Sequence, residues 1–441
     1  MTTQSAADTK LRLSRGLGRV RSRTFSMTDA LSNDDLHGQF NPLMSPLVWD
    51  MGHIANFEEY WVLRELGGQD AHDAERDAMY NPFDNPRWIR GDLPLLDRDE
   101  ATGYLHSVRR EVDLVLSRSD IIEGPQLAHG GYVFEMTIQH EAQHQETILQ
   151  ALNLREDLDP YDLSVARRLP TPRSVDERER VRIEGGPFDM GTNDRTSAYD
   201  NERPAHVVHV ETFDIDRFPV TNARFVEFIK SEGYERPELW SKEGWSWRTS
   251  VDHHAPQGWH RDGEGGWTQV MLGTIRTLDP REPVIHISFW EAEAFAKYEG
   301  GRLPTEMEWE KAASTDPDSV RTRKYPWGDE PPTREHANIG QLGWGPAPVG
   351  SYPLGASARG VEQLLGDVYE WTSSRFLPYP GYSTFPYPEY SEVFFEDEEY
   401  RVLRGASWAT APSVARNTFR NWDYRQRRQI LAGVRLAWDV Q

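Results

Sequence analysis

The chain has 441 residues, which is long for one compact domain and fits two or three folded units. Its 49 basic and 71 acidic residues give a formal charge of −22, the wrong sign for a surface that neutralises phosphates. We therefore expect neither nucleic acid nor an anionic membrane as a partner. Because the chain has no cysteine, disulfides, thiolate metal ligands and a cysteine nucleophile are excluded, and any sulfur chemistry needs a thiol from a substrate.

Apolar residues make up 37% of the chain and include 16 tryptophans, which is enough material for hydrophobic cores. No apolar run approaches the roughly 18 residues that a membrane helix needs. The N-terminus also lacks the apolar segment of a secretion signal. These features predict a soluble, cytoplasmic protein.

The first part of the chain has the apolar periodicity of four helices. The clearest pattern covers residues 47–66, where apolar side chains recur at spacings of three and four. A second covers 132–154, and weaker ones cover roughly 9–38 and 98–118. A four-helix bundle over residues 1–155 is the simplest assembly. We interpret the basic residues of the first helix as a solvated face: Arg12, Arg15, Arg19, Arg21 and Arg23.

The pattern changes after the predicted bundle. Charged, proline-rich sequence fills residues 156–180 and is typical of a domain linker. From 181 to 441 the chain has short strand-like runs such as HVVHVETFDI and RVLRGASW, with many Gly and Pro turns. Two clear helical patterns lie near 221–232 and 289–300. The prediction is an α+β two-domain protein with a loop-rich second domain.

Three histidines stand on inward-facing stripes of the predicted bundle. His140 and His144 are four residues apart, so both rings leave the same face of one helix. His53 lies on the apolar stripe of the helix at 47–66 and could meet them at a single point. Such a set can bind one metal ion. Each ring could equally be a core histidine that is bonded to a neighbouring backbone or carboxylate group.

The segment HEAQH also fits the H-E-x-x-H template, in which two histidines bind zinc and the glutamate, here Glu141, is the general base of a protease. Against this hypothesis, residues 145–155 contain neither the Gly nor the His of the metzincin continuation. Three neutral His ligands leave about three open positions on an octahedral metal. This suits a redox-active iron that binds oxygen and co-substrates.

The second half of the chain carries a series of specific motifs: IEGGPFDMGTN, FPVTNARFVEFI, YPWGDE, GDVYEWTSS, RVLRGASW and GVRLAWD. Together they closely resemble the formylglycine-generating-enzyme-like domain, a C-type-lectin-like fold, over residues 181–441. The formylglycine-generating enzymes themselves depend on catalytic cysteines, which this chain lacks. Their activity is therefore excluded.

The first half contains NPLMSPLVWDMGHIANFEEYW and HEAQHQETILQALN, which resemble a DinB-like four-helix bundle with a three-histidine metal site. The fusion of the two domains, ending in RNTFRNWDYRQRRQILAGVRLAWD, resembles the sulfoxide synthases of ergothioneine biosynthesis, the hercynine oxygenases. This resemblance implies a non-haem Fe(II) enzyme that uses O2 to join the thiol of γ-glutamylcysteine to imidazole C2 of hercynine (trimethylhistidine). The sulfur is oxidised to a sulfoxide.

The resemblance also implies roles for single residues of the predicted bundle. His53, His140 and His144 match the family's iron ligands. Gln143 matches a contact to the hercynine imidazole, although an exposed helix position would explain it as well. Two arginines in NPRWIRGDLP match positions that bind the carboxylates of γ-glutamylcysteine: Arg87 and Arg90.

Further roles are implied in the second domain. Arg427 matches a third arginine of the carboxylate clamp, with Arg425 and Arg428 beside it as possible substitutes. The family's hercynine-binding motif, which suits a quaternary ammonium group, corresponds to Asn421, Trp422 and Asp423. Tyr387 and Tyr390 resemble the active-site tyrosines. We assign to Tyr387 the proton donation that steers oxygen chemistry toward the sulfoxide.

We expect the active site at the interface of the two domains, with loops near 380–428 forming most of the substrate pocket, in a protein that is a monomer. Other hypotheses stay open. A related enzyme could use histidine with cysteine, as in ovothiol synthesis, or a selenium donor. The chain could also be a zinc hydrolase built on HEAQH, or a non-catalytic protein that binds a ligand through its lectin-like domain.

Overall fold

The computed structural model describes residues 3–155, 169–317 and 319–440. The chain divides into two compact units. The first is Met1–Arg155 with Asp194–Ser197, and the second is Glu156–Asn193 with Ala198–Gln441. Most of the predicted linker at 156–180 lies outside the described residues. No described helix combines the length and the apolar character that crossing a membrane needs.

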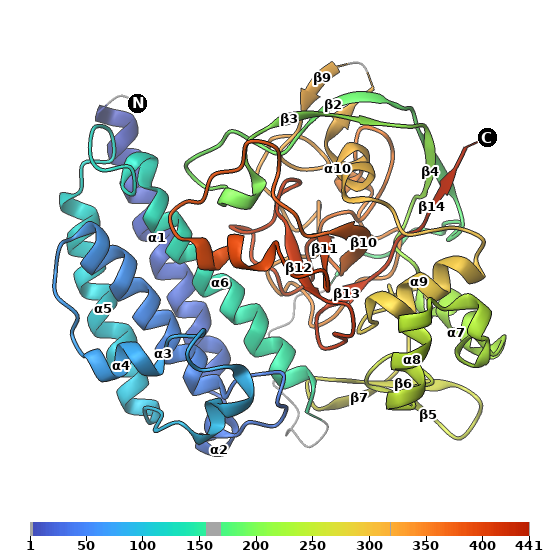
Figure 1. The fold of residues 1–441 in the computed structure, drawn as a ribbon, viewed down its shortest axis with the longest axis horizontal. Helices are drawn as coiled ribbons and strands as arrows, with labels where there is room; N and C mark the ends of the chain where they lie inside the picture. The colour runs from blue at the N-terminus through green and yellow to red at the C-terminus, as the bar shows by residue number, and fades with distance from the viewer. Residues whose placement is uncertain (1–2, 156–168, 318, 441) are drawn as a thin grey trace. The chain divides into compact units, whose positions relative to one another are not determined.

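The first unit is the expected four-helix bundle, in which the long helices α1, α3, α5 and α6 lie side by side (Figure 1). Its helical elements are α1 (Thr3–Thr28), α2 (Asn33–His37), α3 (Leu47–Glu58), the π-helix η1 (Glu59–Leu66), α4 (Ala74–Met79), the 3-10 helix η2 (Arg87–Asp92), α5 (Arg98–Arg118), the 3-10 helix η3 (His129–Gly131) and α6 (Tyr132–Asn153).

The helix predicted over residues 9–38 is two helices in the structure. The Ser32 side chain accepts a hydrogen bond from the backbone N–H of Asp35, and the Asp35 side chain accepts one from the Ser32 N–H. This capping box starts α2 as a separate helix because it satisfies backbone donors that would otherwise continue the preceding helix.

The interpretation of the first helix as a solvated basic face is wrong for Arg21. This side chain is buried and donates to Glu141 at 2.8 Å and to Glu58 at 2.8 Å. Arg109 completes a closed ring, with Glu58 at 2.6 Å and Glu141 at 2.8 Å. The ring joins α1, α3, α5 and α6, one charged residue from each. Arg12, by contrast, pairs with Glu135 at 2.7 Å while its own side chain stays exposed.

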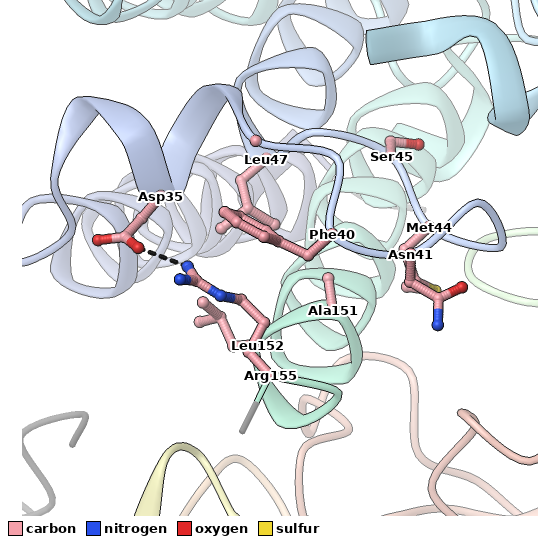
Figure 2. A pocket seen from close by; sticks show the side chains of 10 residues that line it. Asp35, Phe40, Asn41, Met44, Ser45, Leu47, Ala151, Leu152 and Arg155 are labelled. Atoms are coloured by element: carbon pink, nitrogen blue, oxygen red, sulfur yellow. Dashed lines mark hydrogen bonds and ion pairs between the residues drawn. The ribbon is translucent and has the colours of Figure 1, made fainter. Parts of the chain in front are cut away.

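The end of α6 is tied to α2 by Arg155. Figure 2 shows its guanidinium group directed at Asp35, with which it forms an ion pair. The same group lies 3.6 Å from the ring centroid of Phe40, a cation–π contact. A small pocket is lined here by Leu47 and Leu152, among others (Figure 2). Because its one basic group already has these two partners, we regard the pocket as part of the packing of the bundle.

The second unit mixes short strands with helices, as expected. Its strands are β1 (Arg180–Ile183), β2 (Gly186–Met190), β3 (His206–Val210), β4 (Phe213–Asp216), β5 (Trp259–Arg261), β6 (Trp267–Met271), β7 (Thr274–Thr277), β8 (Thr315–Asp316), β9 (Ser319–Thr322), β10 (Tyr369–Arg375), β11 (Tyr400–Gly405), β12 (Asn421–Tyr424), β13 (Ala432–Gly433) and β14 (Ala437–Asp439). Its α-helices are α7 (Asn222–Lys230), α8 (Lys242–Val251), α9 (Phe289–Tyr298) and α10 (Glu306–Ser314). Its 3-10 helices are η5 (Asp200–Glu202), η6 (Gly233–Glu235), η7 (Pro237–Leu239), η8 (Pro353–Gly355), η9 (Pro388–Tyr390) and η10 (Glu392–Phe394).

The strands of the second unit form small sheets. The largest has the order β12-β11-β10-β13, and a three-stranded sheet has the order β1-β4-β14. The run HVVHVETFDI forms two strands of different sheets, because β3 pairs with β2 whereas β4 pairs with β1 and β14. Helices α7 and α9 confirm the two predicted helical patterns. Helices α8 and α10 were not predicted, although the capping box of Thr305 and Glu308 is a visible start signal for α10.

Candidate active site

The three predicted histidines meet inside the first unit. His53 comes from α3, whereas His140 and His144 come one turn apart from α6. One ligand atom from each ring can be chosen so that all three lie within 4.8 Å of one another. The ring centroids are 5.1 Å apart for His53 and His140, 4.9 Å for His53 and His144, and 4.5 Å for His140 and His144. The three rings form a candidate metal site.

Hydrogen bonds fix which nitrogen of two rings faces the candidate site. Nδ1 of His53 donates to the backbone carbonyl of Tyr80 at 2.8 Å. Nδ1 of His144 donates to Oδ1 of Asp50, also at 2.8 Å. Each bond leaves the lone pair on Nε2, the state that a metal ligand requires.

Burial keeps two of the histidines neutral. It lowers the pKa of His53 well below its ordinary value, and the nearby His144 adds to this decrease. It does the same to the pKa of His140, with His144 and His53 adding to the decrease. Because a protonated imidazole cannot bind a metal, the low pKa values favour the ligand form at neutral pH.

Aromatic side chains hold two of the rings from the side. Trp49 stacks on His53, with centroids 4.7 Å apart and planes 12° apart. Phe57 stacks on His140 at 3.6 Å and 6°. Trp49, His53 and Phe57 are all buried in α3 and follow the predicted inward stripe at spacings of four. The walls restrict ring rotation, so the donor atoms are held in place before a metal binds.

The three imidazoles fit a divalent transition metal, but the position of Glu141 does not fit the zinc-protease hypothesis. In that hypothesis Glu141 would face the metal as a general base. In the structure, Glu141 instead belongs to the buried ring of charged residues, where it accepts hydrogen bonds from Arg21, Thr24 and Arg109. Burial raises the pKa of Glu141, but the two arginines outweigh this and hold it below its ordinary value. Both carboxylate oxygens are occupied, so the hypothesis of an HExxH hydrolase is not supported.

The other bundle residues expected at the site have different surroundings. Gln143 is half-buried on α6, directly before His144, and Arg87 is half-buried at the start of η2. Arg90 is buried, donates to Asn85 and Ser45, both at 2.8 Å, and lies 3.5 Å from the ring centroid of Trp49. Burial lowers the pKa of Arg90 to about 10, the charge of Arg87 adds to this decrease, and Asp50 acts in the opposite direction.

In the second unit the structure brings the two predicted tyrosines next to one another. Tyr387 directly precedes η9 and meets Tyr390 edge-on, with ring centroids 6.3 Å apart. Tyr390 is stacked on Tyr199 at 4.2 Å and meets the edge of Trp422 at 5.6 Å. Tyr390 is thus held between two rings, while Tyr387 is half-buried beside it.

The predicted Asn-Trp-Asp motif lies in strand β12. Because side chains alternate along a strand, Asn421 and Asp423 share one face and Trp422 takes the other. Trp422 packs flat on Phe376, with centroids 4.1 Å apart, in a small hydrophobic cluster. Asp423 is 3.6 Å from Nε of Arg427, so the structure brings these two expected site residues together.

Sequence reasoning missed two buried carboxylates beside the candidate residues. One is Asp50, the partner of His144. The other is Asp200, which accepts hydrogen bonds from the Tyr382 hydroxyl at 2.7 Å, the Ser391 hydroxyl at 2.6 Å and the backbone N–H of Phe385 at 3.2 Å. Burial raises the pKa of Asp200, and these bonds act against the increase. Asp200 thereby holds the loop that carries Tyr387.

A signal in the sequence existed for only one of the two. Asp50 stands three residues before His53 on a helix whose buried residues are mostly apolar, an unusual position for a charged residue. Asp200 stands 187 residues before Tyr387 and in a turn-rich segment, so nothing local indicates its partners.

Two family models match the chain. The model of the DinB superfamily matches residues 17–148, and that of the sulfatase-modifying factor enzyme 1-like domain matches residues 166–440. The hercynine oxygenase of Mycolicibacterium smegmatis is 46% identical over 432 residues, which cover 96% of this chain and 98% of that protein. This chain belongs to the hercynine oxygenase family.

Other relatives agree with this assignment. The hercynine oxygenase of Mycolicibacterium thermoresistibile is 46% identical over 447 residues, covering 99% of this chain and 97% of that protein. The formylglycine-generating enzyme of Mycobacterium tuberculosis is 32% identical over 234 residues, covering 46% of this chain and 75% of that protein. Full-length similarity to the oxygenases makes this family member an oxidoreductase, and the expected fusion of two domains is confirmed.

Proposed function

We propose that this family member is an Fe(II)- and O2-dependent sulfoxide synthase acting on hercynine and γ-glutamylcysteine. One C–S bond forms between imidazole C2 of hercynine and the thiol sulfur, at the expense of one C–H and one S–H bond. One atom of O2 becomes the sulfoxide oxygen, and the other leaves as water with the two hydrogens. The four electrons that O2 accepts come from the two substrates, so no further reductant is needed.

The cluster of three imidazoles is the observation that carries this proposal. His53, His140 and His144 offer one nitrogen each and no negative charge, which leaves several positions on an octahedral metal for substrates. When bound there, Fe(II) would supply the redox chemistry with O2. The relatives that match nearly the whole chain are named hercynine oxygenases, which supports hercynine as the substrate.

The arginines are proposed to bind the two carboxylates of γ-glutamylcysteine. A guanidinium group presents planar pairs of N–H donors that match a carboxylate. Arg87 and Arg427 are both half-buried. Arg90 has five N–H donors, and its bonds to Asn85, Ser45 and Pro82 within the described residues use three of them. The remaining two can hold a carboxylate oxygen.

Hercynine presents an imidazole ring and a trimethylammonium group. We propose that Gln143, next to the ligand His144 on α6, forms a hydrogen bond with the imidazole of hercynine. Asn421 and Asp423 offer oxygens to the trimethylammonium group from one face of β12, and Trp422 shapes this strand by its packing on Phe376. Asp423 also orients Arg427, so the two substrate-binding roles are coupled through one ion pair.

Tyr387 is proposed as the proton donor. Tyr390 stacks on Tyr199 and meets Tyr387 edge-on, and both tyrosines are half-buried; the resemblance to the family's active-site tyrosines is the reason for choosing Tyr387. Tyr387→Phe keeps the ring contact but removes the proton. We expect this variant to bind metal normally and to consume O2, with the yield of coupled sulfoxide falling by about 100-fold or more, a loss typical for removal of a general acid. An unchanged product distribution would refute the assignment.

The test of the whole proposal is oxygen consumption by protein loaded with Fe(II) under anaerobic conditions, with mass spectrometry of the products. Coupled sulfoxide should form only when hercynine, γ-glutamylcysteine and O2 are all present. Replacing the pair by histidine and cysteine tests the ovothiol-type alternative in the same assay. Coupling with that pair alone, or activity that persists with Zn(II) in place of Fe(II), would overturn the proposal.

A further inference from the structure

The carboxylate of Asp50 connects the two helices that carry the candidate metal ligands. Asp50 lies on α3, one turn before His53, and its Oδ1 accepts the Nδ1 hydrogen of His144 on α6 at 2.8 Å. The Asp50 side chain is 2% exposed and that of His144 is 17% exposed. The bond is therefore well shielded from water, and a single residue of α3 sets the orientation of a ring on α6.

The second oxygen of Asp50 is unusual. Oδ2 is buried and accepts no hydrogen bond from any residue in the described parts of the chain. Arg90 is the nearby cation, but its hydrogen bonds go to Asn85, Ser45 and Pro82. A buried carboxylate with one unsatisfied oxygen is costly unless another positive charge lies close by. A divalent cation bound by His144 would be such a charge, one imidazole ring away.

The electrostatics of the ligand set lead to the same conclusion. Imidazole ligands carry no charge when they bind a metal, so the three rings of this site would leave the full double charge of a divalent metal uncompensated. A carboxylate bonded to one imidazole reduces the net charge by one unit, and it makes that imidazole a stronger donor. Many iron sites hold a carboxylate directly among their ligands. In this site the carboxylate of Asp50 is bonded to the ligand His144 instead of binding the metal directly.

We infer that Asp50 is a positioning residue for the metal. It holds His144 in the tautomer whose lone pair is on Nε2, and it supplies the negative charge that the three imidazoles lack. This inference rests on the metal site of the proposed function, but it does not depend on which substrates the enzyme joins.

Two variants separate geometry from charge. In Asp50→Asn the amide oxygen can still accept the Nδ1 hydrogen, so only the charge is lost. In Asp50→Ala both the charge and the hydrogen bond are lost. The control is Glu135→Gln, which removes another buried carboxylate, located in the first turn of α6 and paired with the exposed Arg12.

Binding of Co(II), a coloured probe that needs no oxygen chemistry, is measured by visible absorption and by competition with a chelator. We expect about tenfold weaker binding for Asp50→Asn and up to about 100-fold for Asp50→Ala, with an altered visible spectrum in Asp50→Ala. Glu135→Gln should match the wild type in both respects. Circular dichroism of each variant shows whether it is folded.

Folded Asp50→Asn and Asp50→Ala proteins with wild-type Co(II) affinity and spectrum would overturn the inference. If Asp50→Ala does not fold, the isosteric Asp50→Asn decides alone, and wild-type affinity in that variant has the same meaning. Wild-type protein that binds no Co(II) would overturn the inference together with the metal site. Failure of the proposed function alone would give a different result. Co(II) binding would still depend on Asp50, but the sulfoxide assay would be negative.

Discussion

The buried ring of charges offers a sharp test of what the HEAQH segment does. Glu141→Gln should destabilise the bundle but leave turnover per folded molecule unchanged. In the ring, Glu141 accepts bonds from Arg21 at 2.8 and 3.2 Å, from Arg109 at 2.8 Å and from Thr24 at 2.7 Å. If the glutamate were instead a general base at the metal, the same variant would fold normally and lose activity.

The size of the effect follows from these contacts. Removing one partner of a buried ion pair costs about 3–5 kcal/mol, because the other charge stays buried without compensation. Glutamine keeps one acceptor oxygen for Arg21 or Arg109 but turns an amide N–H toward the other guanidinium. We therefore expect a loss near the lower limit, about 3 kcal/mol in the free energy of unfolding. Glu135→Gln, whose partner Arg12 is largely exposed, should lose about 1 kcal/mol or less.

Urea unfolding followed by circular dichroism measures the free energy, and O2 uptake at a temperature where both proteins are folded measures turnover. Our interpretation predicts a lower unfolding midpoint for Glu141→Gln with O2 uptake close to that of the wild type. A variant of wild-type stability that has lost all turnover would refute the interpretation and would restore the hypothesis of a general base.

Three further predictions concern other residues. His140→Ala removes one of three ligands, so Co(II) binding measured by absorption should fall below detection. Asp200→Asn weakens the bonds to Tyr382 and Ser391, so limited proteolysis should cut the loop at 382–391 faster. Burial lowers the pKa of His286 from 6.5 to about 4, so this residue stabilises the fold above pH 6.5 and less as the pH falls toward 4. Between about pH 7 and about pH 5, the wild type should lose about 2 kcal/mol in the free energy of unfolding because of His286. The variant His286→Asn should not show this part of the loss.

Each of these has a result that would count against it. Unchanged Co(II) affinity in His140→Ala would mean that the ion binds elsewhere. Equal cleavage rates in Asp200→Asn and wild type would show that Asp200 does not hold the loop. His286 has a positive φ of 63°, which asparagine tolerates. The free energy of unfolding at about pH 7 is the control, because it shows whether the substitution itself changes the stability. An equally steep pH dependence in His286→Asn would assign the effect to other groups.

The bundle and its histidines could be predicted from the sequence because both depend on local periodicity. The spacing of Trp49, His53 and Phe57 puts them on one face of a helix, and the same holds for His140 and His144. A helix face that is apolar apart from histidines indicates rings directed at a core. The convergence of the three rings needed only the packing of two such faces against one another.

Partners that are distant in sequence could not be predicted in this way. Arg21 follows the buried Leu13 and Leu17 at spacings of four, which places it on the inner face of α1, but its partners Glu58 and Glu141 come from other helices. The partners of Asp200 lie in a loop 182 to 191 residues further along the chain. In both cases the charged or polar partners come from other segments, and no pattern within one segment identifies them.

We propose that this protein couples hercynine and γ-glutamylcysteine with O2 at a site held by three histidines. The most direct measurement is mass spectrometry of the product formed from hercynine and γ-glutamylcysteine by the Fe(II)-loaded protein under isotopically heavy O2. We expect a coupled sulfoxide that carries one heavy oxygen atom in the wild type and no product in His140→Ala. A sulfoxide without heavy oxygen, or one formed equally by His140→Ala, would contradict it.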